Sequence, residues 1–137
     1  MTEDFQKLMA QMMAQGAEMA KAAGVDPKAM PDFGSMADWM PTMPPEMMEM
    51  FMGKTMNPEG LDAKTRLLCT LSGFVAQGAV AEDQIRVTVR HALAAGATPQ
   101  EVIEVIAQMA ALAGVPAMTK AMELARVEID KTEESKA

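Results

Sequence analysis

Residues 61–126 read LDAKTRLLCTLSGFVAQGAVAEDQIRVTVRHALAAGATPQEVIEVIAQMAALAGVPAMTKAMELAR, and this stretch decides the fold. It contains an explicit helix start at TPQE, residues 98–101. The Thr98 hydroxyl can accept a hydrogen bond from the Glu101 N–H, and the Glu101 carboxylate can accept one from the Thr98 N–H. Pro99 then occupies the first helical position, where its missing N–H costs nothing. The pattern predicts a helix that begins at residue 99.

Glycines divide the same stretch into further helices. Gly96 can end the preceding helix in the left-handed region, and Gly114, followed by Val115 and Pro116, predicts a second joint of that kind. Asp62 is a suitable N-cap for the first helix. Apolar residues recur at three- and four-residue spacing between these joints. They predict helices over residues 62–77, 81–95, 99–113 and 116–131, of which the third is apolar over most of its surface and should be central.

The rest of the chain also favours helices. Hydrophobic residues make up 50% of the chain and aromatic residues only 4%, so the apolar mass is mainly Ala, Met, Leu and Val. No alternating apolar and polar run is long enough for a strand. Three N-terminal segments are expected to be helical: residues 2–23, one turn near 35–40 capped by Ser35, and a short helix that Pro44-Pro45 opens.

We therefore expect an all-α protein, a compact bundle of about five or six helices. Residues 61–130 should form its core, and residues 1–60 should supply methionine-rich helices and a loop that pack on it. Residues 131–137 are polar and should form a frayed tail. The small residues of the 62–77 helix would let another helix come close, which favours a homo-oligomer.

Charge and length argue against several classes of partner. The net charge of −7 disfavours nucleic acid and an anionic membrane surface. No window approaches the ~18 uninterrupted apolar residues of a membrane span. The acidic start, MTEDFQKLM, lacks the basic region of a signal peptide. We expect a cytoplasmic protein with neither a nucleic-acid nor a membrane partner.

Three motifs of the decisive stretch resemble a known family. LDAKTRLL, HALAAGATPQEV and AGVPA, in this order and spacing, resemble the carboxymuconolactone decarboxylase family, which shares a superfamily with alkyl hydroperoxidase D. The resemblance covers residues 51–127. It implies an alkyl hydroperoxidase D-like helical fold and a homo-oligomer, a trimer or hexamer. It also implies a cofactor-free lyase that acts on a small carboxylated lactone, with a site between helices 62–77 and 81–95.

The peroxidase branch of that superfamily uses a Cys-x-x-Cys pair followed by a histidine. The family spacing places the two cysteines near Ala81 and Gln84, and neither position holds one. Cys69 is the only cysteine of the chain, so it cannot form an intramolecular disulfide. Peroxidase or other disulfide-cycling oxidoreductase activity is therefore disfavoured, because it needs a nucleophilic thiolate and a resolving thiol.

The decarboxylase branch keeps the histidine, and its position here is Thr88, one turn before His91, the only histidine. Histidine can donate a proton to a developing carbanion, whereas threonine can only hydrogen-bond. His91, Thr88 and a reactive Cys69 are therefore the catalytic candidates. Arg66, which matches the arginine of the family's first motif, and Arg90 are the candidates for binding a substrate carboxylate.

Each candidate also has a plainer interpretation. His91 can be a partly exposed helix residue or can hydrogen-bond at a subunit interface. Cys69 can be a small buried hydrophobe, which is the commoner role of a free cysteine. Arg66 can form an ion pair on the surface or at an interface.

Methionine is concentrated in the N-terminal part of the chain. Of 17 methionines, all but Met109, Met118 and Met122 lie in residues 1–56. They can pack a core or interface, or line a groove with which a non-catalytic family member binds an apolar ligand or partner. A soft-metal site is a third interpretation, because thioethers suit Cu(I). No histidine or cysteine lies near them in sequence, so packing is preferred, and no cofactor or metal is expected.

Overall fold

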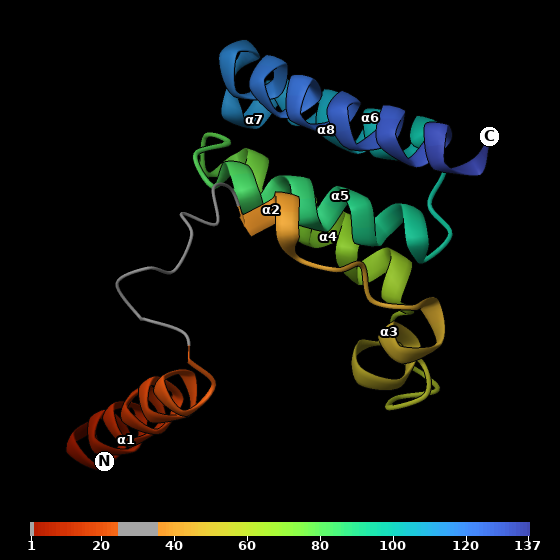
Figure 1. The fold of residues 1–137 in the computed structure, drawn as a ribbon. Helices are drawn as coiled ribbons and strands as arrows, with labels where there is room; N and C mark the ends of the chain where they lie inside the picture. The colour runs from red at the N-terminus through yellow and green to blue at the C-terminus, as the bar shows by residue number, and fades with distance from the viewer. Residues whose placement is uncertain (1, 25–35) are drawn as a thin grey trace. The chain divides into compact units, whose positions relative to one another are not determined.

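The computed structural model describes residues 2–24 and 36–137, which contain eight α-helices and no strand (Figure 1). The all-α prediction is confirmed. The chain divides into two compact units, residues 1–34 and 35–137. In the first, α1 spans Thr2–Ala22, close to the predicted 2–23, and Gly24 follows it with a φ of +75°. The domain boundaries predicted at residues 60 and 130 stay a prediction.

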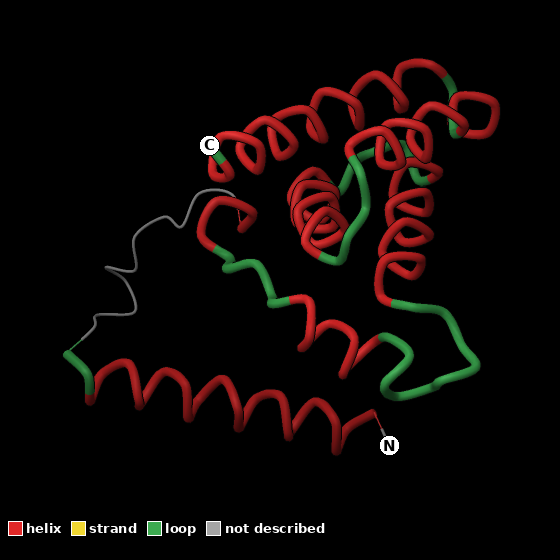
Figure 2. The backbone as a smooth tube through the Cα atoms, turned by 90° about the vertical axis from the view of Figure 1, so that its right-hand side faces the viewer, coloured by secondary structure: helices red, strands yellow, loops and turns green. Residues whose placement is uncertain are grey.

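The second unit is a bundle of four helices with shorter helices at its edges (Figures 1 and 2). The main helices are α4 (Ala63–Ala76), α5 (Glu82–Ala94), α6 (Pro99–Gln108) and α8 (Val115–Lys136). α5 packs extensively against both α4 and α8, whereas α6 packs mainly on α8 and α4. The prediction that the 99–113 helix is central was therefore wrong, because much of the far side of α6 is exposed. The fully buried apolar residues include Leu71, Val75, Ile85, Val89, Val102, Ile106, Ala121 and Ala125.

The predicted helix starts are confirmed. The Asp62 carboxylate accepts a hydrogen bond from the Thr65 N–H at 2.8 Å and caps α4. The capping box is complete, with the Thr98 hydroxyl and the Glu101 carboxylate each accepting the other's backbone N–H at 3.0 Å. These caps satisfy amide groups that would otherwise have no partner at the helix ends.

Gly96 ends α5 as predicted. Its φ is +107°, the Gly96 N–H donates to the Leu93 carbonyl, and the Ala97 N–H donates to the Ala92 carbonyl at 2.9 Å. This is the Schellman pattern of paired hydrogen bonds, which satisfies the last carbonyls of the helix. α4 ends with the same pattern at Gly78, which accounts for the break expected near residues 77–79.

The joint at Gly114 differs from the prediction. Its φ of +89° is positive, but its ψ of 159° is not that of a left-handed helix, and α8 begins directly at Val115. The predicted 99–113 helix is also interrupted at Met109, so it forms α6 and the single turn α7 (Ala110–Ala113). α8 continues to Lys136, beyond the predicted end at residue 131, although most of its residues after Ile129 are exposed.

The small residues of α4 face outward in the described part of the chain. Cys69, Thr70, Gly73 and Ala76 are exposed, so the alternative that Cys69 is buried was wrong for this unit. The predicted homo-oligomer stays a prediction. None of the described helices combines the length and hydropathy that a membrane crossing requires.

Two glycine substitutions should have opposite effects on stability. Gly96→Ala should lower the free energy of unfolding by about 1 kcal/mol, because alanine is strained at a positive φ. Gly73→Ala should raise it by about 0.5 kcal/mol, because Gly73 lies inside α4 and nothing lies within 4 Å of the added Cβ. Urea unfolding followed by circular dichroism measures both. Destabilisation by Gly73→Ala would indicate that this face of α4 is covered in solution.

A segment before the bundle lies along α5. We call residues 36–43 the strap; it contains α2 (Met36–Trp39) and leads into α3 (Pro45–Met52). α2 packs on α5 and α3 packs on α4. The predicted turn near residues 35–40 is confirmed from Met36 onward, whereas its cap, Ser35, lies outside the described residues.

Candidate functional site

The strap is held to α5 at both ends by backbone amides. The Met36 N–H donates to the Asp83 carboxylate at 2.8 Å, and the Met43 N–H donates to His91 Nε2 at 3.0 Å. Asp83 and His91 lie about two turns apart on α5. One helix therefore provides acceptors for both ends of the strap.

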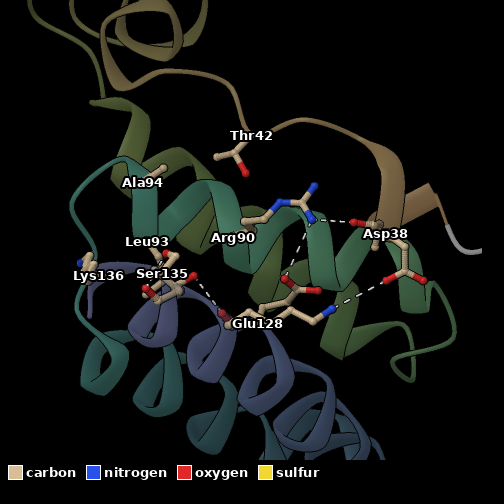
Figure 3. A pocket seen from close by; sticks show the side chains of 11 residues that line it. Asp38, Thr42, Arg90, Leu93, Ala94, Glu128, Ser135 and Lys136 are labelled. Carbon is tan, nitrogen blue, oxygen red and sulfur yellow. Dashed lines mark hydrogen bonds and ion pairs between the residues drawn. The ribbon is translucent and has the colours of Figure 1, made fainter.

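Arg90 holds the middle of the strap. Its guanidinium donates to the carbonyls of Ala37 and Met40, which belong to α2 and its C-terminal end. Figure 3 shows the Arg90 side chain between the strap and α8, facing Glu128. Because carbonyls at the end of a short helix lack partners within it, Arg90 supplies the donors that α2 needs.

Glu128 on α8 contacts the two arginines that bind the strap. Only 1% of its side chain is exposed, and it accepts a hydrogen bond from Arg86 Nε at 2.8 Å. Its other oxygen lies 3.9 Å from Arg90, and Arg86 also binds the Asp38 carboxylate of the strap at 2.7 Å. Lys131 lies 3.7 Å from Asp38. A buried carboxylate thus connects α8, α5 and the strap through two arginines.

A polar cavity of about 500 Å³ lies over this network. Among its charged lining groups, Lys131 pairs with Asp38 and Arg90 lies near Glu128, and Arg90 already donates to two carbonyls. A substrate carboxylate would therefore have to displace existing partners of Arg90. The lining residues are Ala37, Asp38, Thr42, Arg90, Leu93, Ala94, Glu128, Lys131, Thr132, Ser135 and Lys136.

The network should make the strap sensitive to acid. The hydrogen bond from Arg86 lowers the pKa of Asp38, and Lys131 contributes in the same direction. A lowered folded-state pKa means that this stabilisation is present above the unfolded-state pKa and is lost as the pH falls through the folded-state pKa. Asp38→Asn should therefore destabilise the protein at neutral pH, with a difference from wild type that disappears between about pH 5 and pH 2.

Urea unfolding at a series of pH values checks this expectation. Glu123→Gln is the matched control, because Glu123 is exposed on α8. A constant difference between wild type and Asp38→Asn at all pH values would show that the Asp38 charge contributes nothing.

Thr88 and His91 line a different hollow, of about 270 Å³, beneath the strap. Thr88 is 7% exposed, and within the described part of the chain its hydroxyl has no hydrogen-bond partner. Apart from this hydroxyl and the His91 ring, the side chains around the hollow are apolar. They come from the strap, α3, α4 and α5. We call this space the methionine hollow; Met40, Met43, Met48, Met52, Leu67, Val87, Thr88 and His91 line it.

Both ring nitrogens of His91 are engaged by backbone groups. Nε2 accepts the Met43 N–H, so in the neutral ring the proton is on Nδ1. Nδ1 lies 2.8 Å from the Val87 carbonyl and donates to it. In this arrangement His91 attaches the strap to α5. Its one ring proton is already used in the hydrogen bond to the Val87 carbonyl, so the ring has no proton to give to a ligand.

The other two candidates lie elsewhere. Cys69 is exposed and lines a separate groove between α4 and α6, together with Lys64, Glu101 and Gln108. Arg66 Nε donates to the Leu61 carbonyl at 3.3 Å, and within the described residues it forms no ion pair. Of the five predicted site residues, the structure therefore brings only Thr88 and His91 together. The described residues contain no cluster of three or more His, Cys, Asp or Glu that could hold a metal ion.

Sequence reasoning missed Glu128, Asp38 and Asp83. One signal was available for Glu128, because it follows Ala121 and Ala125 at helical spacing on the buried face of α8. A carboxylate on such a face requires a buried cation. Nothing in the sequence indicates that Asp38 of the strap contacts α5, or that Asp83 of α5 contacts the strap, because these contacts join distant segments.

The chain is similar to known proteins over most of its length. The model of the carboxymuconolactone decarboxylase family matches residues 44–127. An uncharacterized 15.0 kDa protein of the nqo9–nqo10 intergenic region in Paracoccus denitrificans is 51% identical over 126 residues, which cover 92% of this chain and 93% of that protein. No solved structure matches. The family match begins at Pro44 and so leaves the strap out.

Proposed function

Because the chain belongs to the carboxymuconolactone decarboxylase family, we propose that its ligand site is the methionine hollow, which the strap, α3, α4 and α5 line. We propose further that the hollow binds a small, mostly apolar molecule and does not act on it as a lyase. The observation that carries this proposal is the double backbone engagement of His91. The only histidine of the chain serves the strap, so no proton donor of the expected kind faces the hollow.

The lining of the hollow indicates the class of ligand. Four methionines adapt to differently shaped apolar molecules, because the side chain is flexible and its sulfur is polarizable. A volume of about 270 Å³ suits a molecule of one or two rings. The Thr88 hydroxyl is available for one hydrogen bond. The expected ligand is therefore neutral and compact, with a single polar group.

A carboxylated lactone fits this lining less well. Neither Arg66 nor Arg90 lines the hollow, and each already donates to backbone carbonyls. An ionised carboxylate is costly to transfer into apolar surroundings without a cation. The family supports the lyase interpretation. The side chains that line the hollow do not support it, because they include no arginine to bind the carboxylate.

Methionine methyl groups report directly on this proposal. Protein labelled with ¹³C at the methionine methyls is titrated with indole, an apolar probe with one N–H donor. We expect the resonances of Met40, Met43, Met48 and Met52 to shift together, while those of Met50 and Met56, outside the hollow, stay unchanged. Equal shifts at all methionines, or none, would contradict the proposal.

Thr88→Val tests the polar contact, because valine keeps the shape and removes the hydroxyl. It should weaken indole binding about fivefold, the equivalent of one ordinary hydrogen bond. In a parallel assay with carboxymuconolactone, the wild-type protein should release no carbon dioxide above the buffer rate. Turnover that is lost in His91→Ala but retained in Cys69→Ser would instead support the lyase.

A further inference from the structure

The fold places a histidine among methionines that lie far from it in sequence. Met40 and Met43 come from the strap, Met48 and Met52 lie one turn apart on α3, and His91 comes from α5. We propose that the methionine hollow binds one Cu(I) ion through methionine sulfurs and the imidazole of His91. This inference goes beyond the proposed organic ligand and does not depend on it.

The donor set selects the kind of metal. Thioethers and imidazole suit Cu(I), whereas Mg²⁺ and Ca²⁺ require oxygen ligands. Among the residues that the structure describes, no carboxylate lines the hollow. A monovalent soft ion therefore matches both the ligand chemistry and the absence of negative charge among these lining residues.

The Nδ1 hydrogen bond of His91 is of the kind that metal-ligating histidines make. A ligating histidine commonly donates its other ring N–H to a backbone carbonyl, which fixes the tautomer and the ring. Here Nδ1 donates to the Val87 carbonyl, and the Nε2 lone pair accepts the Met43 N–H. The ion would take the place of that N–H on Nε2, so binding would release one attachment of the strap.

The sulfurs can adjust to a common centre. Met48 is 1% exposed and fixed in the core, whereas Met52 is 38% exposed and Met40 and Met43 are half-buried on the strap. Methionine has three rotatable bonds, so partly exposed side chains can reorient at modest cost. Met48 would provide the fixed donor, and the others would close around the ion.

The test is a Cu(I) competition titration with bicinchoninate, performed without oxygen on the full chain. It uses Cys69→Ser as background, because an exposed thiol could bind Cu(I) by itself. We expect this protein to retain one equivalent of Cu(I), with shifts of the Met40, Met43, Met48 and Met52 methyl resonances.

Paired variants localise the ion. Met43→Leu with Met52→Leu should lower the Cu(I) affinity more than about tenfold, because two donors are lost while shape is nearly kept. Met50→Leu with Met56→Leu should leave it unchanged, since both are exposed outside the hollow. Equal affinities of the two pairs, or no retention by Cys69→Ser, would overturn the site. Indole binding is measured on metal-free protein, so the two proposals can fail separately.

Discussion

Replacing Glu128 by alanine should lower the free energy of unfolding by about 3 kcal/mol, because it leaves partly buried Arg90 without a carboxylate and Arg86 with that of Asp38 alone. The Arg86 and Arg90 side chains are only 13% and 18% exposed, and Glu128 lies 2.8 Å from Arg86 Nε. Removing one partner of a buried charge network costs more than the network contributes, since the remaining charges stay desolvated. Urea unfolding of the full chain measures the difference.

Two further variants separate charge from packing. Glu128→Gln keeps a hydrogen-bond acceptor and the side-chain volume, so it should lose less stability than Glu128→Ala. Glu123→Ala, on the exposed side of the same helix, should change stability by less than about 0.5 kcal/mol. If Glu128→Ala behaves like Glu123→Ala, the network does not hold the strap as described.

Replacing His91 by alanine should lower the free energy of unfolding by about 2 kcal/mol, from a lost acceptor and lost ring packing. The Met43 N–H would lose its partner, whereas the attachments of the strap to Asp83, Arg90 and Arg86 would remain. The expected signature is structural, so it should appear in urea unfolding without any substrate or metal.

His91→Gln is the matched control, because its amide oxygen can accept the Met43 N–H. It should recover part of the stability that His91→Ala loses. Equal losses in the two variants would show that ring packing, rather than the hydrogen bond to the strap, is what His91 contributes. No loss in either would remove the structural argument against a catalytic His91.

The helix boundaries were largely predictable because their signals are local. Asp62, Thr98 with Glu101, and Gly96 each act on backbone groups within a few residues, and all three do so in the structure. Gly114 differs from the prediction because it is also the N-cap of α8, and its ψ of 159° is extended. The central position of α5 depends on contacts with both α4 and α8, which local patterns do not encode.

The candidate site was predictable only in part for the same reason. Thr88 and His91 share a helix, so their proximity followed from helical spacing. Their surroundings did not follow, because Met40, Met43 and Met48 reach them from other segments. Because His91 is distant from the methionines in sequence, a metal site was not expected. The fold brings His91 and four methionines to the same hollow. Arg90 was expected to bind a ligand but binds the strap, whose position no local pattern indicated.

The attachments of the strap to α5 join residues that are 47 to 53 positions apart in the chain. Closing such a loop has an entropic cost that adjacent helices do not face, so the strap should dock late, onto helices that are already assembled. The same contacts should also be the first to open under native conditions. The Met36 and Met43 amides would then exchange with solvent deuterium well before the buried amides of α5. Because Met40 and Met43 of the strap line the methionine hollow, that part of its wall should open by local unfolding, with a free energy that is a fraction of the global one.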